Sequence, residues 1–253
     1  MEKNGKCHIC GKNSKLTFEH VPPKSFFNNQ RVNIISGDEI LKTLTRTNIK
    51  PWDTAGLKYN IQQKGIGDYT LCEACNNYTG SKYVPEYIEF SKVGYKTLQD
   101  LKPDSNNIIR LTLHDVYPLR IIKQIITMFC SKFPESFLDK NTDLREFILN
   151  SKATKIDTSK FRISMYFNKY PITQFMGITI MGTNNGIREI STMDIYPFGF
   201  VFEINPKSIC SELDITEFAN KYKYDEMKTI QIDLPVYERN TIIPLDYRTK
   251  DQI

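Results

Sequence analysis

Apolar positions follow two different periods along the second half of the chain. Between Val116 and Phe133 they recur every three or four residues, with extra apolar side chains on the other faces, which predicts a largely buried helix. Shorter helical patterns cover 144–150 and 211–221. Five other stretches have strand character: Phe161–Phe167, Gln174–Met181, Ile187–Met193, Tyr196–Ile204 and Thr229–Leu234.

The connections between these strands predict how they pair. Asn184-Asn185-Gly186 is a tight-turn signal between two of them, and strands joined so closely run antiparallel. We therefore expect residues 101–253 to form an α+β domain, with an antiparallel sheet covered by the central buried helix.

The first half has fewer regular patterns. Leu16 to Val21 alternates like a short strand, and the following Pro22-Pro23 ends its pairing. A helix is expected from Asn76, and a second one from Pro85. Between the strand and the first of these helices, residues 25–66 read as an insertion, in which 34–44 predicts a short strand–helix excursion. The polar stretch 98–107 predicts a boundary between domains 1–100 and 101–253.

Composition and charge narrow the function classes. The 253 residues are 40% hydrophobic and 12% aromatic, which is enough for a packed core and excludes a disordered or collagenous chain. Residues 1–100 hold 14 Lys and Arg against 10 Asp and Glu, a net charge of +4, and residues 101–253 hold 20 against 19, a net +1. The basic excess lies mainly in the first half, which suits a phosphate-bearing substrate.

Segments that would direct the chain to a membrane are not apparent. No apolar run is long enough to span a bilayer, and the N-terminus leads into cysteines without the apolar core of a signal peptide. We therefore expect a cytoplasmic protein that does not bind a membrane. In such a reducing compartment, paired cysteines indicate metal binding rather than disulfides.

Two Cys-x-x-Cys pairs are the clearest chemical signal. Cys7 and Cys10 lie in a turn closed by Gly11, and Cys72 and Cys75 lie 61 residues further on, counted between the pairs. Four thiolates of this kind predict one structural, tetrahedral zinc site. Redox-active or unrelated thiols are the alternatives. Zinc binding would bring the segment around His20 close to Asn76.

Glu19 and His20 stand at the predicted end of the first strand. Adjacent residues on a strand point to opposite faces, but the twist at a strand end can bring both near one ion. A histidine beside a carboxylate is a candidate general base, because its pKa lies near the working pH. The alternative interpretation is a surface or capping histidine.

These motifs together resemble the HNH endonucleases. The family pattern is similar to Cys7/Cys10, then Glu19-His20 at a strand end, then Leu71-Cys72-x-x-Cys75-Asn76 entering a helix. The resemblance covers about the first third of the chain and implies a ββα-metal fold stapled by zinc. It implies His20 as general base, Glu19 and Asn76 as ligands of a catalytic cation, and the four cysteines as zinc ligands.

One family feature is missing from its usual place. The middle asparagine, which orients the base through a backbone contact, usually precedes the second cysteine pair by a few residues. Residues 65–70 contain no asparagine. Asp68 or Asn60 are the candidates to replace it, and a degenerate member of the family that does not cleave is the remaining alternative.

The resemblance also implies two metals with different roles. Oxygen ligands at Glu19 and Asn76 favour Mg²⁺ or Mn²⁺, which would neutralise charge on a phosphate, while thiolates favour zinc. Asn77 is the alternative amide ligand, and Lys24 and Lys82 are candidate phosphate contacts.

The expected activity is hydrolysis of phosphodiester bonds in DNA, and the family's roles include restriction and antiviral defence. The basic insertion, with Trp52 as a stacking residue or a local core anchor, suits contact with nucleic acid. Residues 101–253 would bind substrate, sense a ligand, bind a protein partner or form a homo-oligomer. The second interpretation is a non-catalytic zinc-stabilised module that binds nucleic acid or protein.

Overall fold

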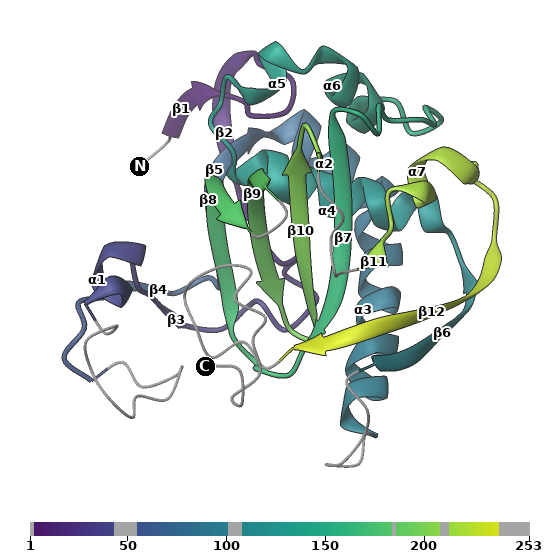
Figure 1. Ribbon diagram of the computed structural model, residues 1–253. Coiled ribbons are helices and arrows are strands. Elements are labelled where there is room, and N and C mark those ends of the chain that lie inside the picture. Colours follow the sequence, from purple (N-terminus) through teal and green to yellow (C-terminus); the bar gives the residue numbers. More distant parts are fainter. Residues whose placement is uncertain (1–2, 43–54, 101–107, 184–185, 208–212, 238–253) are drawn as a thin grey trace.

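The computed structural model describes residues 3–42, 55–100, 108–183, 186–207 and 213–237. In these residues it is a mixed α+β fold with seven helices, two small antiparallel sheets and one seven-stranded mixed sheet (Figure 1). This confirms the predicted α+β class. No described helix is long and apolar enough to cross a membrane.

The first sheet carries both cysteine pairs and the Glu19-His20 motif at its strand ends. Its order is β1-β2-β5, with β2 antiparallel to both neighbours. The predicted first strand is confirmed, and it begins three residues earlier than expected. The elements are β1 (Lys3–Lys6), β2 (Asn13–His20) and β5 (Gly67–Cys72), followed by the helices α2 (Glu73–Lys82) and α3 (Val84–Gln99).

The insertion between β2 and β5 contains the predicted short strand–helix excursion. Strand β3 (Val32–Ile34) pairs antiparallel with β4 (Asn60–Gln62), and helix α1 (Gly37–Leu41) follows β3. Ser36 accepts a hydrogen bond from the Glu39 backbone nitrogen and so caps the N-terminus of α1. Trp52 lies outside the described residues.

The large sheet forms the centre of the second half. Its order is β6-β12-β7-β10-β9-β8, and β11 also pairs with β7. All five predicted strands are present, within a few residues of their predicted ends. The strands are β6 (Ile108–Val116), β7 (Phe161–Asn168), β8 (Thr173–Thr183), β9 (Gly186–Ile195), β10 (Phe198–Ile204), β11 (Leu213–Asp214) and β12 (Lys228–Tyr237).

Three predictions about this half need correction. The sheet is mixed and not purely antiparallel, because β12 runs parallel to β7 over its last residues. Strand β6 was not predicted, although Ile109, Leu111 and Leu113 alternate inward along it. The helix expected over 211–221 shortens to α7 (Glu217–Lys221), because β11 uses the residues before it. Asn184 and Asn185 lie outside the described residues.

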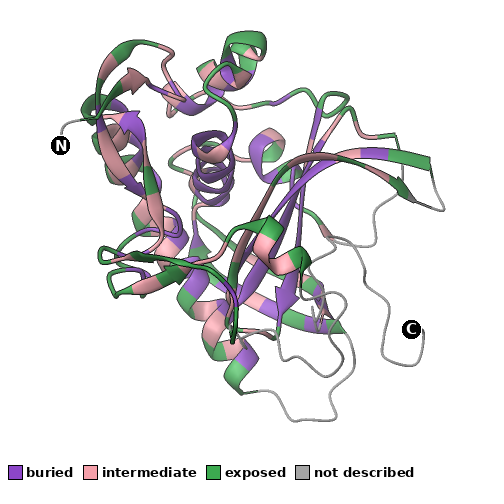
Figure 2. Cartoon of the chain, turned by 90° about the vertical axis from the view of Figure 1, so that its left-hand side faces the viewer, coloured by how far each residue is buried: buried purple, intermediate pink, exposed green. Residues whose placement is uncertain are grey.

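Helix α4 (Pro118–Lys132) is the predicted central helix, and it is buried on nearly every face (Figure 2). The shorter helices α5 (Phe137–Lys140) and α6 (Thr142–Leu149) follow it. The aromatic rings of Phe129 and Phe133 pack against Phe202 on β10, with ring centroids 5.4 and 5.3 Å apart.

One hydrophobic core joins the described parts of both predicted domains. Leu16 and Leu71 belong to the same buried cluster as Ile122 and Phe198. On α3, Phe90 stacks on Phe198 with ring centroids 4.5 Å apart. The predicted boundary at 100–107 lies almost entirely outside the described residues.

Candidate functional site

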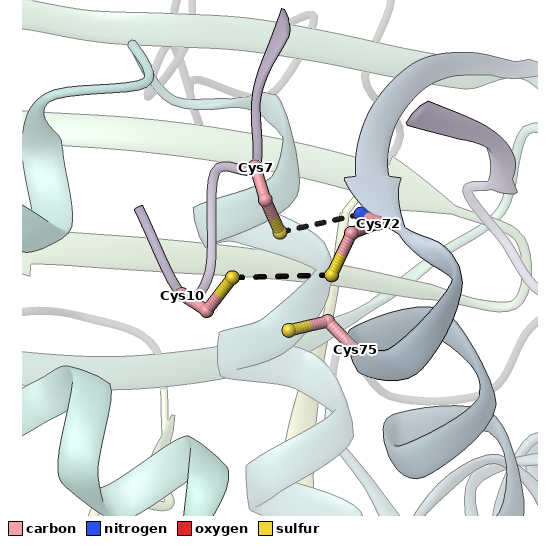
Figure 3. A group of neighbouring side chains, drawn as sticks. All are labelled: Cys7, Cys10, Cys72 and Cys75. Atoms are coloured by element: carbon pink, nitrogen blue, oxygen red, sulfur yellow. Dashed lines mark hydrogen bonds between the residues drawn. The ribbon is translucent and has the colours of Figure 1, made fainter. Parts of the chain in front are cut away.

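The four cysteines of the two Cys-x-x-Cys pairs meet in one cluster. Their sulfur atoms all lie within 4.8 Å of one another. Cys7 and Cys10 come from the turn between β1 and β2, Cys72 ends β5, and Cys75 lies in the first turn of α2. Figure 3 shows the four side chains pointing toward a common centre.

The cluster has the geometry of a zinc site and not of a disulfide. Zinc–sulfur bonds of about 2.3 Å in a tetrahedron place the sulfurs about 3.8 Å apart. The Cys10 and Cys72 sulfurs lie 3.9 Å apart, and the described cysteines are all free of disulfides. The predicted grouping is therefore confirmed, and the residues fit a structural zinc ion.

Hydrogen bonds within the cluster favour a thiolate at Cys7. The Cys75 thiol and the Cys72 backbone N–H, whose nitrogen lies 3.3 Å away, lower the pKa of Cys7 to about 4. The same contact with Cys7 raises the pKa of Cys75. A bound zinc ion would supply the positive charge that the remaining thiols need in order to ionise.

The turn that carries Cys7 and Cys10 also contacts residues from the second half of the chain. Arg145 on α6 donates from Nε to the Ile9 carbonyl oxygen at 3.0 Å and pairs with Asp139 at 2.5 Å. Gly11 has φ of +75°, and a Cβ there would lie 3.0 Å from an Arg145 nitrogen. The positive φ therefore favours glycine at this turn.

His20 is held by the backbone of the loop that precedes β5. Its Nε2 lies 2.8 Å from the Lys64 carbonyl oxygen. A carbonyl only accepts hydrogen bonds, so Nε2 carries the proton and Nδ1 keeps a lone pair. Partial burial lowers the pKa of His20, the hydrogen bond to the Lys64 carbonyl opposes this shift, and the nearby charges of Lys24 and Lys64 lower the pKa further. The net shift favours the neutral imidazole.

Glu19 is the buried carboxylate of this region. It is 7% exposed, and burial raises its pKa to about 7. Among the residues that the structure describes, no side chain or backbone group donates a hydrogen bond to it. A buried carboxylate without a donor is costly unless a proton or a cation neutralises it. Glu19 therefore suits a cation ligand.

Asn76 turns toward β2, whereas Asn77 is exposed. The Asn76 side-chain nitrogen donates to Thr17 Oγ1 at 3.0 Å and to the Phe18 carbonyl at 3.4 Å. Its Oδ1 has no hydrogen-bond donor within the described ranges and remains available as a ligand. Of the two neighbouring amides, only Asn76 lies against the strand that carries Glu19.

The two faces of β2 separate the candidate residues. Alternation places Thr17 and Glu19 on one face and Phe18 and His20 on the other. The contacts agree, since Asn76 touches Thr17 while the rings of Phe18 and His20 lie 4.8 Å apart. His20 and Asn76 share no hydrogen bond in the described structure, and Asn76 contacts β2 at Thr17 and Phe18, before the strand end that carries His20.

Neither Asp68 nor Asn60 orients His20. Asp68 pairs across the strands with Glu19 and accepts from the Tyr69 backbone nitrogen, while Asn60 is exposed in β4 opposite Ile34. Lys24 is exposed near His20, and Lys82 is exposed at the last residue of α2.

Asn28 supplies the loop contact that the sequence analysis missed. It is 4% exposed, and its side chain donates to the carbonyls of Pro22 at 2.6 Å and Ile66 at 2.7 Å. Its Oδ1 accepts from the Ile66 backbone nitrogen at 2.5 Å. Gly65 packs so closely that a Cβ would lie 2.3 Å from the Asn28 carbonyl oxygen. Asn28 thus fixes the loop whose Lys64 carbonyl holds His20.

Only a weak sequence signal points to Asn28. It is one of two adjacent asparagines in a polar insertion, about 40 residues before the position where the family pattern expects the amide.

Comparisons of the chain with protein-family models, curated proteins and solved structures find no match.

Proposed function

We propose that this protein is a metal-dependent endonuclease that hydrolyses phosphodiester bonds in nucleic acid, with DNA as the expected substrate. The observation that carries the proposal is the neutral His20 ring, whose Nε2 is bound by the Lys64 carbonyl and whose Nδ1 is left as a base. The preceding residue on β2, Glu19, presents a buried carboxylate on the other face of the strand, and no described group donates a hydrogen bond to it. The resemblance to HNH endonucleases agrees with this arrangement.

Each residue has a role in the proposed reaction. His20 Nδ1 removes a proton from the water that attacks phosphorus, and the Lys64 carbonyl keeps the ring in the required orientation. Glu19 and the Oδ1 of Asn76 would hold a divalent cation. When bound, Mg²⁺ or Mn²⁺ supplies positive charge for the phosphate and the leaving 3′-oxygen. Lys24 and Lys64 are exposed cations close enough to His20 to attract a phosphate.

The test is nicking of supercoiled plasmid by the zinc-loaded protein with Mg²⁺, Mn²⁺ or EDTA. His20→Ala should lower the rate by about 10²- to 10⁴-fold, the usual contribution of a general base. His114→Ala is the matched control, because His114 is an exposed histidine on β6. Rising salt should also depress cleavage steeply through counterion release. Equal cleavage by His20→Ala and the parent would refute the assignment.

A second function is favoured by one observation. The four cysteines are the sole group of three or more His, Cys, Asp or Glu ligands found in the described residues. Glu19 and Asn76 offer two ligand oxygens, so a zinc-stabilised module that binds nucleic acid or protein without cutting is the alternative. Binding of plasmid without nicking under any divalent cation would support it.

A further inference from the structure

Phe27 presents an aromatic ring to solvent from a strained backbone. The side chain is 73% exposed, the largest fraction for any aromatic residue that the structure describes. Its φ is +54°, a conformation that bulky side chains rarely adopt and that glycine adopts at no cost. Such strain persists only where the surrounding structure fixes it, and it is concentrated at functional sites.

The neighbours of Phe27 hold its ring in place. Phe26 and Asn28 on either side are both 4% exposed, so the chain is anchored before and after the exposed ring. The ring also contacts Phe26 and Tyr95, with centroids 5.3 and 6.0 Å away. Tyr95 in turn packs edge-on against Tyr196, with centroids 5.7 Å apart. One face of Phe27 is supported, and the rest is open.

The segment that carries this ring is basic. Lys24, just before the insertion, and Arg31, Lys58 and Lys64 within it are all exposed. Of the two acidic residues described in the insertion, Glu39 is paired with Lys42 and also accepts from the Lys58 backbone nitrogen, and Asp38 is exposed. An exposed aromatic among cations is the composition that binds single-stranded nucleic acid, in which the base stacks and the backbone pairs with the cations.

Phe27 is also tied to the candidate base by a short chain of contacts. Asn28, the next residue, holds Ile66 through two hydrogen bonds and packs on Gly65. Lys64 precedes Gly65 and accepts the His20 hydrogen bond. One rigid loop therefore positions both the exposed ring and the imidazole.

We infer that Phe27 stacks on an unpaired base of the substrate, so that the nucleic acid is single-stranded where it meets His20. The inference rests on the proposed function and names its substrate class. A paired base in a duplex has no open face for the ring. An unpaired base has two, and the exposed lysines and arginine of this basic segment would take the flanking phosphates.

The experiment measures binding in a His20→Ala background with Mg²⁺, so that the probe is not cut. The probe is a single-stranded DNA oligonucleotide carrying 2-aminopurine, whose fluorescence falls when an aromatic ring stacks on it. Phe27→Ala should weaken binding about 5- to 150-fold and abolish the quenching. Phe27→Tyr should preserve both. Ile180→Ala, an equally exposed apolar residue on β8, should change neither.

Three results would overturn the inference. Phe27→Ala binding as tightly as the parent, or Phe27→Leu restoring binding and quenching as well as Phe27→Tyr, would exclude stacking. Tighter, Phe27-dependent binding to the matching duplex would exclude a single-stranded site. No binding of any nucleic acid by the parent would instead refute the proposed function, which is a distinct failure.

A stability measurement separates function from folding. Phe27→Gly removes the ring and relieves the positive φ, so its melting temperature should equal or exceed that of the parent while probe binding falls as in Phe27→Ala. A lower melting temperature with lost binding would show that the residue is structural.

Discussion

The antiparallel pair of strands β2 and β5 is held together at its two ends by different groups. At one end, Cys7 and Cys10 meet Cys72 and Cys75, and the closure consists of sulfur atoms within 4.8 Å of one another. At the other end, the Asn28 side chain binds two backbone carbonyls, that of Pro22 just after β2 and that of Ile66 just before β5. The first end offers four thiols that fit a structural zinc ion, and the second is held by one buried amide.

This difference assigns separate tasks to the two ends. A tetrahedral thiolate site uses every ligand position and leaves no room for a substrate, so it stabilises the fold. The histidine end leaves Nδ1 of His20 free of described partners, and further along β2 the Asn76 Oδ1 is free of them too, so we expect the chemistry to involve these atoms. We expect damage at the cysteine end to unfold the protein, and damage at the histidine end to slow the reaction.

The largest effect should follow from breaking the cysteine end. Cys72→Ser removes one of four thiolates, and structural zinc contributes roughly 10 kcal/mol or more of apparent binding free energy to folding. The variant should lose stoichiometric zinc in elemental analysis and its cooperative thermal transition in circular dichroism. Cys130→Ala is the control, because Cys130 is buried in α4 away from the cluster. Retention of one zinc per chain by Cys72→Ser would exclude the four-thiolate site.

A smaller effect should follow from removing a ligand at the histidine end. Asn76→Ala should lower Mg²⁺-dependent nicking by about 100-fold or more, since even outer-shell partners of a metal contribute 10- to 100-fold. The adjacent Asn77→Ala should leave the rate unchanged, because Asn77 is exposed. Both variants should keep their zinc. If Asn77→Ala is the slower enzyme, the inward amide has been assigned to the wrong residue.

The sequence predicted the cysteine end better than the histidine end for a physical reason. Thiolate spacing is a local signal, and a soft metal gathers its ligands regardless of the 61 residues between the pairs. The contact of Asn28 with Ile66 joins residues 38 apart through backbone groups, which leave no trace in the side-chain pattern. Asp68 was therefore considered as the loop-fixing residue, whereas the described contact to the loop comes from Asn28.

The difference between local signals and long-range contacts also explains which features of the large sheet were predicted. Its strands were predicted from their own residues, because alternation and β-branched content are local. The parallel pairing of β12 with β7 was not predicted, because pairing direction depends on the path of the chain between the strands. Strand β6 was missed because the strong helical pattern beginning at Val116 directly follows it.

The smallest expected effect is that of Asn28→Ala, which tests whether the two ends of the β2–β5 strand pair act separately. It removes two donated hydrogen bonds and one accepted one, and leaves the carbonyls of Pro22 and Ile66 without their buried donor. Such a loss costs about 1–3 kcal/mol, to be measured as the free energy of unfolding in urea. Nicking should slow because the Lys64 carbonyl no longer fixes His20, while zinc content stays at one per chain. Asn29→Ala, at the exposed neighbouring asparagine, should match the parent in all three measurements. Loss of zinc from Asn28→Ala would show that the two ends of the strand pair are coupled, and the separation of scaffold from chemistry would then be wrong.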